Sequence, residues 1–77
     1  MQNLEPIKIQ QRFGERVREL RVERQLSQEK LGFAAQLDRT YIVSVEQGRR
    51  NVSLVNIVRI ANALGVSPVE LFIYEQK

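Results

Sequence analysis

Apolar residues recur at helical spacing along most of this chain and predict a series of amphipathic helices. The clearest case is Phe13, Val17 and Leu20, which stand at i, i+4 and i+7 and would line one buried face. Near the end of the chain, residues 67–70 read Ser-Pro-Val-Glu, a capping box with proline at the first helical position. Helices are therefore expected over residues 9–24, 28–34, 39–47, 54–64 and 68–75.

Short polar residues and glycines mark where these helices should begin and end. Ser27 and Asp38 can each cap a helix, because a side-chain oxygen at this position can accept from a backbone N–H left free in the first turn. Ser53 can cap the helix over 54–64 in the same way. Gly48 stands where the helix over residues 39–47 would end, and Gly65 stands where the helix over residues 54–64 would end.

The apolar faces of these helices should meet in one core, which a chain of 77 residues makes just large enough to fold alone. Residues 1–6 show no such period and are expected to be disordered. The core is expected to contain Phe13, Val17, Leu20, Leu31, Ala34, Ala35, Tyr41, Ile42, Val45, Leu54, Ile57, Val58, Ala61, Leu64, Leu71 and Phe72.

The helices over residues 28–34 and 39–47 are joined by a very short turn, so they must cross steeply and share one small apolar patch. Gly32 fits this crossing, because a residue without a side chain lets the second helix approach the first. This is the geometry of a helix-turn-helix, which places the outer face of its second helix in a DNA major groove.

The composition excludes several kinds of function. The chain has no cysteine and no histidine, so it lacks thiolate and imidazole metal ligands and the commonest general base. No pair of carboxylates clusters as an acid and a base would, so we expect no enzymatic activity, no metal and no cofactor. No apolar run approaches the roughly 20 residues that span a bilayer, and no signal peptide is visible, so a cytoplasmic protein without membrane contact is expected.

The formal net charge of +3 is concentrated in the part of the chain that holds the predicted helix-turn-helix. Residues 1–50 contain ten Lys and Arg against seven Asp and Glu, whereas residues 51–77 contain two of each kind. This distribution suits a polyanion such as double-stranded DNA. On charge alone a solvated basic surface is the simpler explanation, so the charge counts only because it coincides with the motif.

The segment from Leu37 to Ile42 reads Leu-Asp-Arg-Thr-Tyr-Ile, and Val45-Glu46 and Gly48-Arg49-Arg50-Asn51 follow it. These residues resemble the helix-turn-helix of the λ-repressor/Cro-like (XRE) family of DNA-binding regulators, and they are similar to the controller proteins of restriction–modification systems. The resemblance extends over residues 13–72. It implies an all-α, compact five-helix λ-repressor-like DNA-binding domain, one single domain over residues 1–77.

The outer face of the second helix of the motif would read the DNA bases. Arg39 stands in its first turn, where a guanidinium can bond both O6 and N7 of guanine. Thr40 could contact a base or the thymine methyl group, and Val43 could pack on a thymine methyl. Ser44 lies beside Val43, one turn further on, and completes the expected base-reading set.

Other residues would hold the DNA backbone or the fold itself. The resemblance matches Gln28 with a phosphate-contacting glutamine, at a helix N-terminus where free N–H groups favour an anion. It also implies a structural ion pair between Arg21 and Glu46, and it places Gln36 at a turn position that usually holds glycine with a positive φ. The expected phosphate contacts are Ser27, Gln28, Arg49, Arg50 and Asn51.

Apolar residues go almost all the way round the predicted helix over 68–75, so some of them should face a partner. The resemblance implies dimerisation through this region, and we expect a two-fold homodimer that uses Val69, Ile73 and Tyr74, with Leu71 and Phe72 in the core. Such a dimer would present its two reading helices about 34 Å apart and would recognise a near-palindrome.

The main hypothesis is therefore a sequence-specific transcriptional regulator that binds a palindromic operator as a homodimer, with a controller role at its own promoter. Double-stranded DNA and a second copy of the chain are the expected partners, with RNA polymerase as a further one. The alternative is an XRE-type antitoxin or protein-interaction module whose main partner is a protein.

Overall fold

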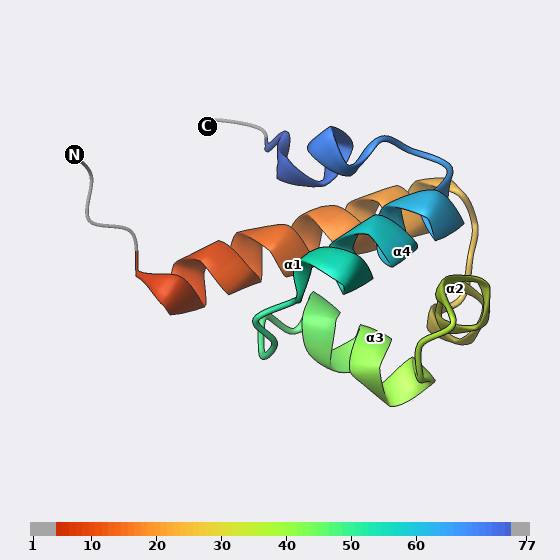
Figure 1. Ribbon diagram of the computed structural model, residues 1–77, viewed down its shortest axis with the longest axis horizontal. Coiled ribbons are helices and arrows are strands. Elements are labelled where there is room, and N and C mark those ends of the chain that lie inside the picture. Colours follow the sequence, from red (N-terminus) through yellow and green to blue (C-terminus); the bar gives the residue numbers. More distant parts are fainter. Residues whose placement is uncertain (1–4, 75–77) are drawn as a thin grey trace.

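The computed structural model describes residues 5–74, which form four α-helices followed by one short 3₁₀ helix (Figure 1). The elements are α1 (Pro6–Glu23), α2 (Gln28–Ala35), α3 (Arg39–Glu46), α4 (Leu54–Leu64) and η1 (Pro68–Phe72). In Figure 1 the long helix α1 runs across the molecule, with α3 below it and η1 above it. Within residues 5–74 no helix is long and apolar enough to cross a membrane.

The first helix begins three residues earlier than the apolar pattern predicts. Pro6 occupies the first helical turn, where its fixed φ suits a helix and its missing N–H is no loss. The carbonyl of Glu5 accepts from the N–H groups of Lys8 (3.0 Å) and Ile9 (3.2 Å). Local hydrogen bonds thus extend the helix past its buried stripe, and the prediction of a disordered end through residue 6 was wrong for Pro6. Residues 1–4 lie outside the described residues.

The turn between α2 and α3 is built from the signals that the sequence carries. Ser27 caps α2, since its side chain accepts from the backbone N–H of Lys30 at 3.0 Å. Gln36 has the left-handed backbone (φ 61°, ψ 40°) that its turn position predicts. Asp38 stands at the start of α3, but its side chain makes no capping hydrogen bond, so that detail of the prediction was wrong. Ser53 caps α4 as expected, by accepting from Asn56 N–H.

Two glycines let the helices of the DNA-binding motif approach closely. A Cβ atom at Gly32 would lie 2.7 Å from the carbonyl oxygen of Leu37, so a side chain there would push α2 away from the turn. Gly14 has the same role between α1 and α3, because a Cβ there would collide with the carbonyl oxygen of Val45. The close approach at Gly32 was predicted from the sequence, whereas that at Gly14 was not, because Gly14 sits in a helix with no turn signal nearby.

The fifth element is a five-residue 3₁₀ helix rather than the α-helix expected over residues 68–75, so the five-helix fold class was wrong in this respect. Ser67 accepts from the N–H of Val69, and Ile73 already has extended backbone angles. The prediction failed because a segment that is apolar on all sides carries no helical period of its own. Glu75, the predicted end, lies outside the described residues.

The core collects one face of every element. Its buried residues are Phe13, Val17, Leu20, Leu31, Ala35, Ile42, Val45, Ile60, Ala61, Leu64 and Leu71. Four residues expected in the core are instead exposed: Ala34, Leu54, Val58 and Phe72. On α4 the buried side is set by Ile60, Ala61 and Leu64, which turns Leu54 and Val58 outward.

Candidate nucleic-acid interface

The outer face of α3 points toward solvent, because the opposite face of the helix is buried in the core. Ile42 and Val45 anchor α3 in the core, with almost no exposed surface. One hundred degrees of rotation per residue then places the predicted base-reading residues together on the other side. Arg39 and Thr40 are exposed in the first turn, and Val43 and Ser44 are half-buried one turn later.

The loop after α3 folds back onto this outer face through Arg50. The Nε group of Arg50 donates to the Ser44 hydroxyl at 3.0 Å, and its guanidinium lies 5.2 Å from the centre of the Tyr41 ring. Ser44 in turn donates to the carbonyl of Tyr41 at 2.9 Å. Asn56 of α4 donates to the Tyr41 hydroxyl at 3.1 Å. Arg50 is therefore held against α3 by Ser44 and Tyr41.

This arrangement engages Ser44 in the free protein. Its hydroxyl accepts one hydrogen bond and donates another, so a contact with DNA would use its remaining lone pair or exchange one of these bonds. Ser44 was predicted to contact bases and Arg50 to contact phosphate, and the structure brings the two side chains together. The contact of Asn56 was not predicted, because one amide side chain on a helix carries no motif.

A second polar cluster joins α1, α2 and α3 beneath the reading helix. Arg21 donates to both carboxylate oxygens of Glu46, from Nε at 2.6 Å and from Nη2 at 3.0 Å. The side chains are only 12% and 3% exposed. The remaining amino group of Arg21 donates to the Leu26 carbonyl at 2.8 Å, and the Gln28 amide donates to Glu46 at 3.1 Å. The paired, two-pronged geometry satisfies both charges where little water reaches them.

The expected phosphate-binding residues fall into two groups. Ser27 and Gln28 stand at the N-terminus of α2, where Ser27 caps the helix and Gln28 is bonded to Glu46. Arg49, Arg50 and Asn51 form the exposed loop after α3. In the sequence, the start of α2 precedes α3 and the basic loop follows it. Free N–H groups at a helix N-terminus favour an anion.

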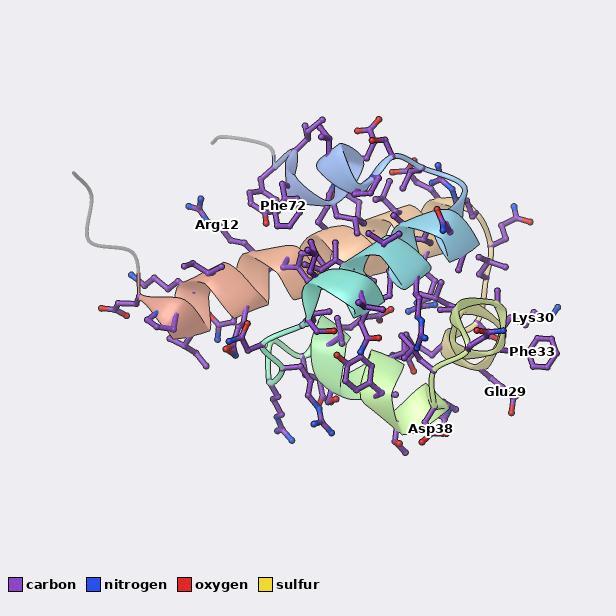
Figure 2. All side chains as sticks on the ribbon, viewed as in Figure 1. Arg12, Glu29, Lys30, Phe33, Asp38 and Phe72 are labelled. Atoms are coloured by element: carbon purple, nitrogen blue, oxygen red, sulfur yellow. The ribbon has the colours of Figure 1, made fainter. Side chains whose placement is uncertain are left out.

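Two other surfaces lie outside this set. An open hollow beside the ion pair is lined by Glu15, Arg18, Glu19, Val22, Glu23 and Glu46, and four carboxylates make it unsuited to phosphate. On the exposed face of α2, Phe33 points away from the body of the protein, next to Lys30 and Glu29 (Figure 2). The candidate DNA-reading face on α3 is therefore distinguished by its polar and cationic groups rather than by a cavity.

Two short helices that cross at Gly32, the second with an exposed polar face and a basic loop behind it, define a helix-turn-helix DNA-binding domain. The helix-turn-helix family model matches residues 17–71. The control protein C.BamHI of Bacillus amyloliquefaciens is 53% identical over 60 residues, which cover 77% of this chain and 74% of that protein. The control protein C.MunI of a Mycoplasma species is 49% identical over 65 residues, which cover 83% and 88%.

A solved structure agrees with these sequence matches. The restriction-modification controller protein C.AhdI of Aeromonas hydrophila superimposes with a TM-score of 0.83 and 54% sequence identity, over 84% of this chain and 98% of that one. The chain belongs to the helix-turn-helix family, as an XRE-type DNA-binding transcription regulator similar to restriction–modification controller proteins.

Proposed function

We propose that this protein controls its own promoter, as part of a restriction–modification system, by binding a near-palindromic operator as a homodimer. The observation that carries the proposal is the outer face of α3, where an exposed arginine in the first turn stands among three more candidate base-reading residues. The similarity to control proteins of restriction–modification systems supports the biological setting. Promoter binding would place the protein in the cytoplasm, where bacterial DNA lies.

Within this proposal the four residues of the outer face have distinct roles. Arg39 reads guanine with two hydrogen bonds, which discriminate the right base by about 1–3 kcal/mol. Thr40 contacts the neighbouring base, and Val43 packs on a thymine methyl. Ser44 contacts a base or orients Arg50. Ser27, Gln28, Arg49, Arg50 and Asn51 neutralise or bond the phosphates, which position the helix without specifying sequence.

The proposed dimer uses apolar groups that the monomer leaves in solvent. Val69 and Ile73 are 64% and 52% exposed, and Tyr74 is half-buried. Burial raises the pKa of Tyr74, against the opposing charge of Arg12, so the phenol is neutral at physiological pH. The exposed face of α4 adds Leu54, Val55 and Val58, and α4 packs directly against η1. We propose that these six apolar residues, on α4 and on the segment from Val69 to Tyr74, form one patch at the dimer interface.

RNA polymerase is a further proposed partner, because a regulator bound at a promoter either blocks or recruits the polymerase according to where its operator lies. The position of the operator, and not a particular contact of this chain, decides which of the two occurs.

The test is binding of the wild type and of Arg39→Ala to the DNA upstream of its own gene, across a series of salt concentrations. Arg18→Ala is the matched control, since it removes one positive charge from an exposed position of α1. We expect the wild type and Arg18→Ala to select the same short palindrome. Arg39→Ala should keep only salt-sensitive binding without sequence preference. If the wild type itself selects no segment, the proposal fails and a protein partner becomes the object of the search.

A further inference from the structure

The 3₁₀ helix η1 cannot hold its shape through its own hydrogen bonds. It has five residues, and the bonds around it are short-range: Glu70 N–H to the Ser67 carbonyl at 2.9 Å and Ile73 N–H to the Glu70 carbonyl at a long 3.4 Å. Isolated turns of this length are unstable in water, because few bonds offset the cost of ordering the backbone. Contacts with the rest of the protein must therefore fix η1.

Three contacts do so, and two of them are apolar. Leu71 is completely buried in the core. The ring of Phe72 lies against that of Phe13 of α1, with centres 5.4 Å apart, as the position of Phe72 beside α1 in Figure 2 illustrates. Such contacts hold η1 against α1, but they are non-directional and do not set the path of its backbone.

The third contact is directional and comes from Arg16 of α1. Its Nε group donates to the main-chain carbonyl of Glu70 at 2.9 Å, across 54 residues of sequence. The guanidinium also pairs with Glu19 on the same helix and lies 3.7 Å from the Glu70 carboxylate. The Arg16 side chain is only 16% exposed, so its position is largely fixed by its neighbours.

The Glu70 carbonyl that Arg16 binds lies between the two exposed residues of the proposed dimer surface. Glu70 stands one residue after Val69 and three before Ile73, the two exposed residues of the proposed dimer surface. Its carbonyl is also the acceptor for the Ile73 N–H, at the point where the chain leaves η1 in an extended conformation. Fixing this one peptide group therefore fixes the direction of the residues on both sides of it.

We infer that Arg16 is a positioning residue for dimerisation: it orders η1 in the monomer so that Val69 and Ile73 are already arranged to meet a second copy. The inference rests on the proposed homodimer. Arg16 itself lies under η1 and acts through the Glu70 carbonyl, so it lowers the cost of ordering the surface at the moment of association.

The experiment compares Arg16→Met with two control variants. Arg16→Met keeps an apolar stem and removes the donor. Glu70→Gln changes the carboxylate but keeps the main-chain carbonyl that Arg16 binds, and Arg18→Met removes the same charge from α1 at an exposed position. The dimer dissociation constant is measured by sedimentation equilibrium. Binding is measured to a palindromic duplex selected by the wild type from a random pool, and to the same duplex with one half scrambled.

We expect Arg16→Met to raise the dimer dissociation constant about tenfold or more, as the loss of a charged hydrogen bond implies. Affinity for the half-scrambled duplex should stay within about twofold, because the reading helix is untouched. Hydrogen exchange of the amides of residues 68–73 should accelerate while those of α2 and α3 keep wild-type rates. Both control variants should dimerise like the wild type.

Dimerisation of Arg16→Met at wild-type strength would overturn the inference. So would an equal loss of dimerisation and of half-site binding, since that would reflect damage to the whole fold. If Arg16→Met does not fold, Arg16→Lys decides: it keeps the charge but cannot place a donor in the same geometry, so wild-type dimerisation by a folded Arg16→Lys overturns the inference and weakened dimerisation supports it. A wild type that stays monomeric at all concentrations removes the proposed dimer instead, and it does so before any variant is compared.

Discussion

The two ends of this small domain are held together in different ways. Around α2 and α3 a polar network fixes the geometry: Arg21 binds Glu46 with two hydrogen bonds, and Gln28 joins them from α2. Around η1 the chain is held by one buried leucine, one pair of rings and one arginine, and it leaves Val69 and Ile73 in solvent. The geometry around α2 and α3 is thus fixed within one copy, whereas the C-terminal end leaves apolar side chains exposed to solvent.

The strongest test of this contrast is Glu46→Ala. It leaves the guanidinium of Arg21 largely buried without its carboxylate partner, which can cost roughly 3–5 kcal/mol. We expect a melting temperature well below that of the wild type in thermal denaturation followed by circular dichroism. The exposed Glu23→Ala is the control and should melt near the wild type. An unchanged melting temperature for Glu46→Ala would remove the structural role of the pair.

The next test places a charge on the exposed apolar surface that follows η1. Ile73→Asp would bury a carboxylate in the proposed dimer interface, so we expect at least a tenfold weaker dimer, about 1.4 kcal/mol, by sedimentation equilibrium. Val22→Asp, at an equally exposed apolar position of α1, is the control and should leave dimerisation unchanged. Equal behaviour of the two variants would show that η1 does not form the interface.

A smaller effect is expected where the loop after α3 contacts the reading helix. Because Arg50 donates to Ser44, alanine substitutions at the two positions should be coupled by about 1 kcal/mol in operator affinity. A double-mutant cycle measures this coupling, and the Ser44/Arg49 cycle serves as comparison. If Ser44 and Arg50 prove additive, the hydrogen bond between them does not survive in the DNA complex.

The smallest effect is expected at the turn. Gln36 has a φ of 61°, which costs a residue with a side chain on the order of 1–2 kcal/mol. Glycine would remove this cost, but its greater conformational freedom in the unfolded chain offsets part of the gain. Gln36→Gly should therefore be neutral or stabilising by up to about 1 kcal/mol in urea denaturation. Gln25→Gly, at a φ of 55°, is a second position of the same kind. Clear destabilisation of Gln36→Gly would mean that its side chain has a role in the fold.

The sequence predicted the parts of the fold that carry a local signal. The bounds of α4 were correct at both ends, because Ser53 caps its start and Gly65 follows its last residue. The left-handed backbone of Gln36 followed from the family resemblance. In contrast, the burial of Ile60 and the exposure of Leu54 depend on how α4 is rotated against α2, and a helix with apolar residues on most sides does not specify that rotation.

The same distinction applies to the candidate site. The outward direction of Arg39 and Thr40 follows from the buried face of α3, which the spacing of Ile42 and Val45 reveals. The contact of Arg50 with Tyr41 and Ser44 could not be predicted, because it depends on the path of a loop and on side-chain rotamers. The bond from Arg16 to Glu70 was equally hidden, since its acceptor is a main-chain carbonyl 54 residues away.

The length of α3 limits how much sequence one copy can read. Eight residues at a rise of 1.5 Å make a helix about 12 Å long, which spans about four base pairs. A given word of four base pairs recurs by chance about once in 250 positions, so a genome with about a million competing sites would contain thousands of copies. Two such helices reading together reduce this frequency to about one in 65,000, because independent probabilities multiply. In the proposed homodimer, a reading helix this short would gain its selectivity from being used twice.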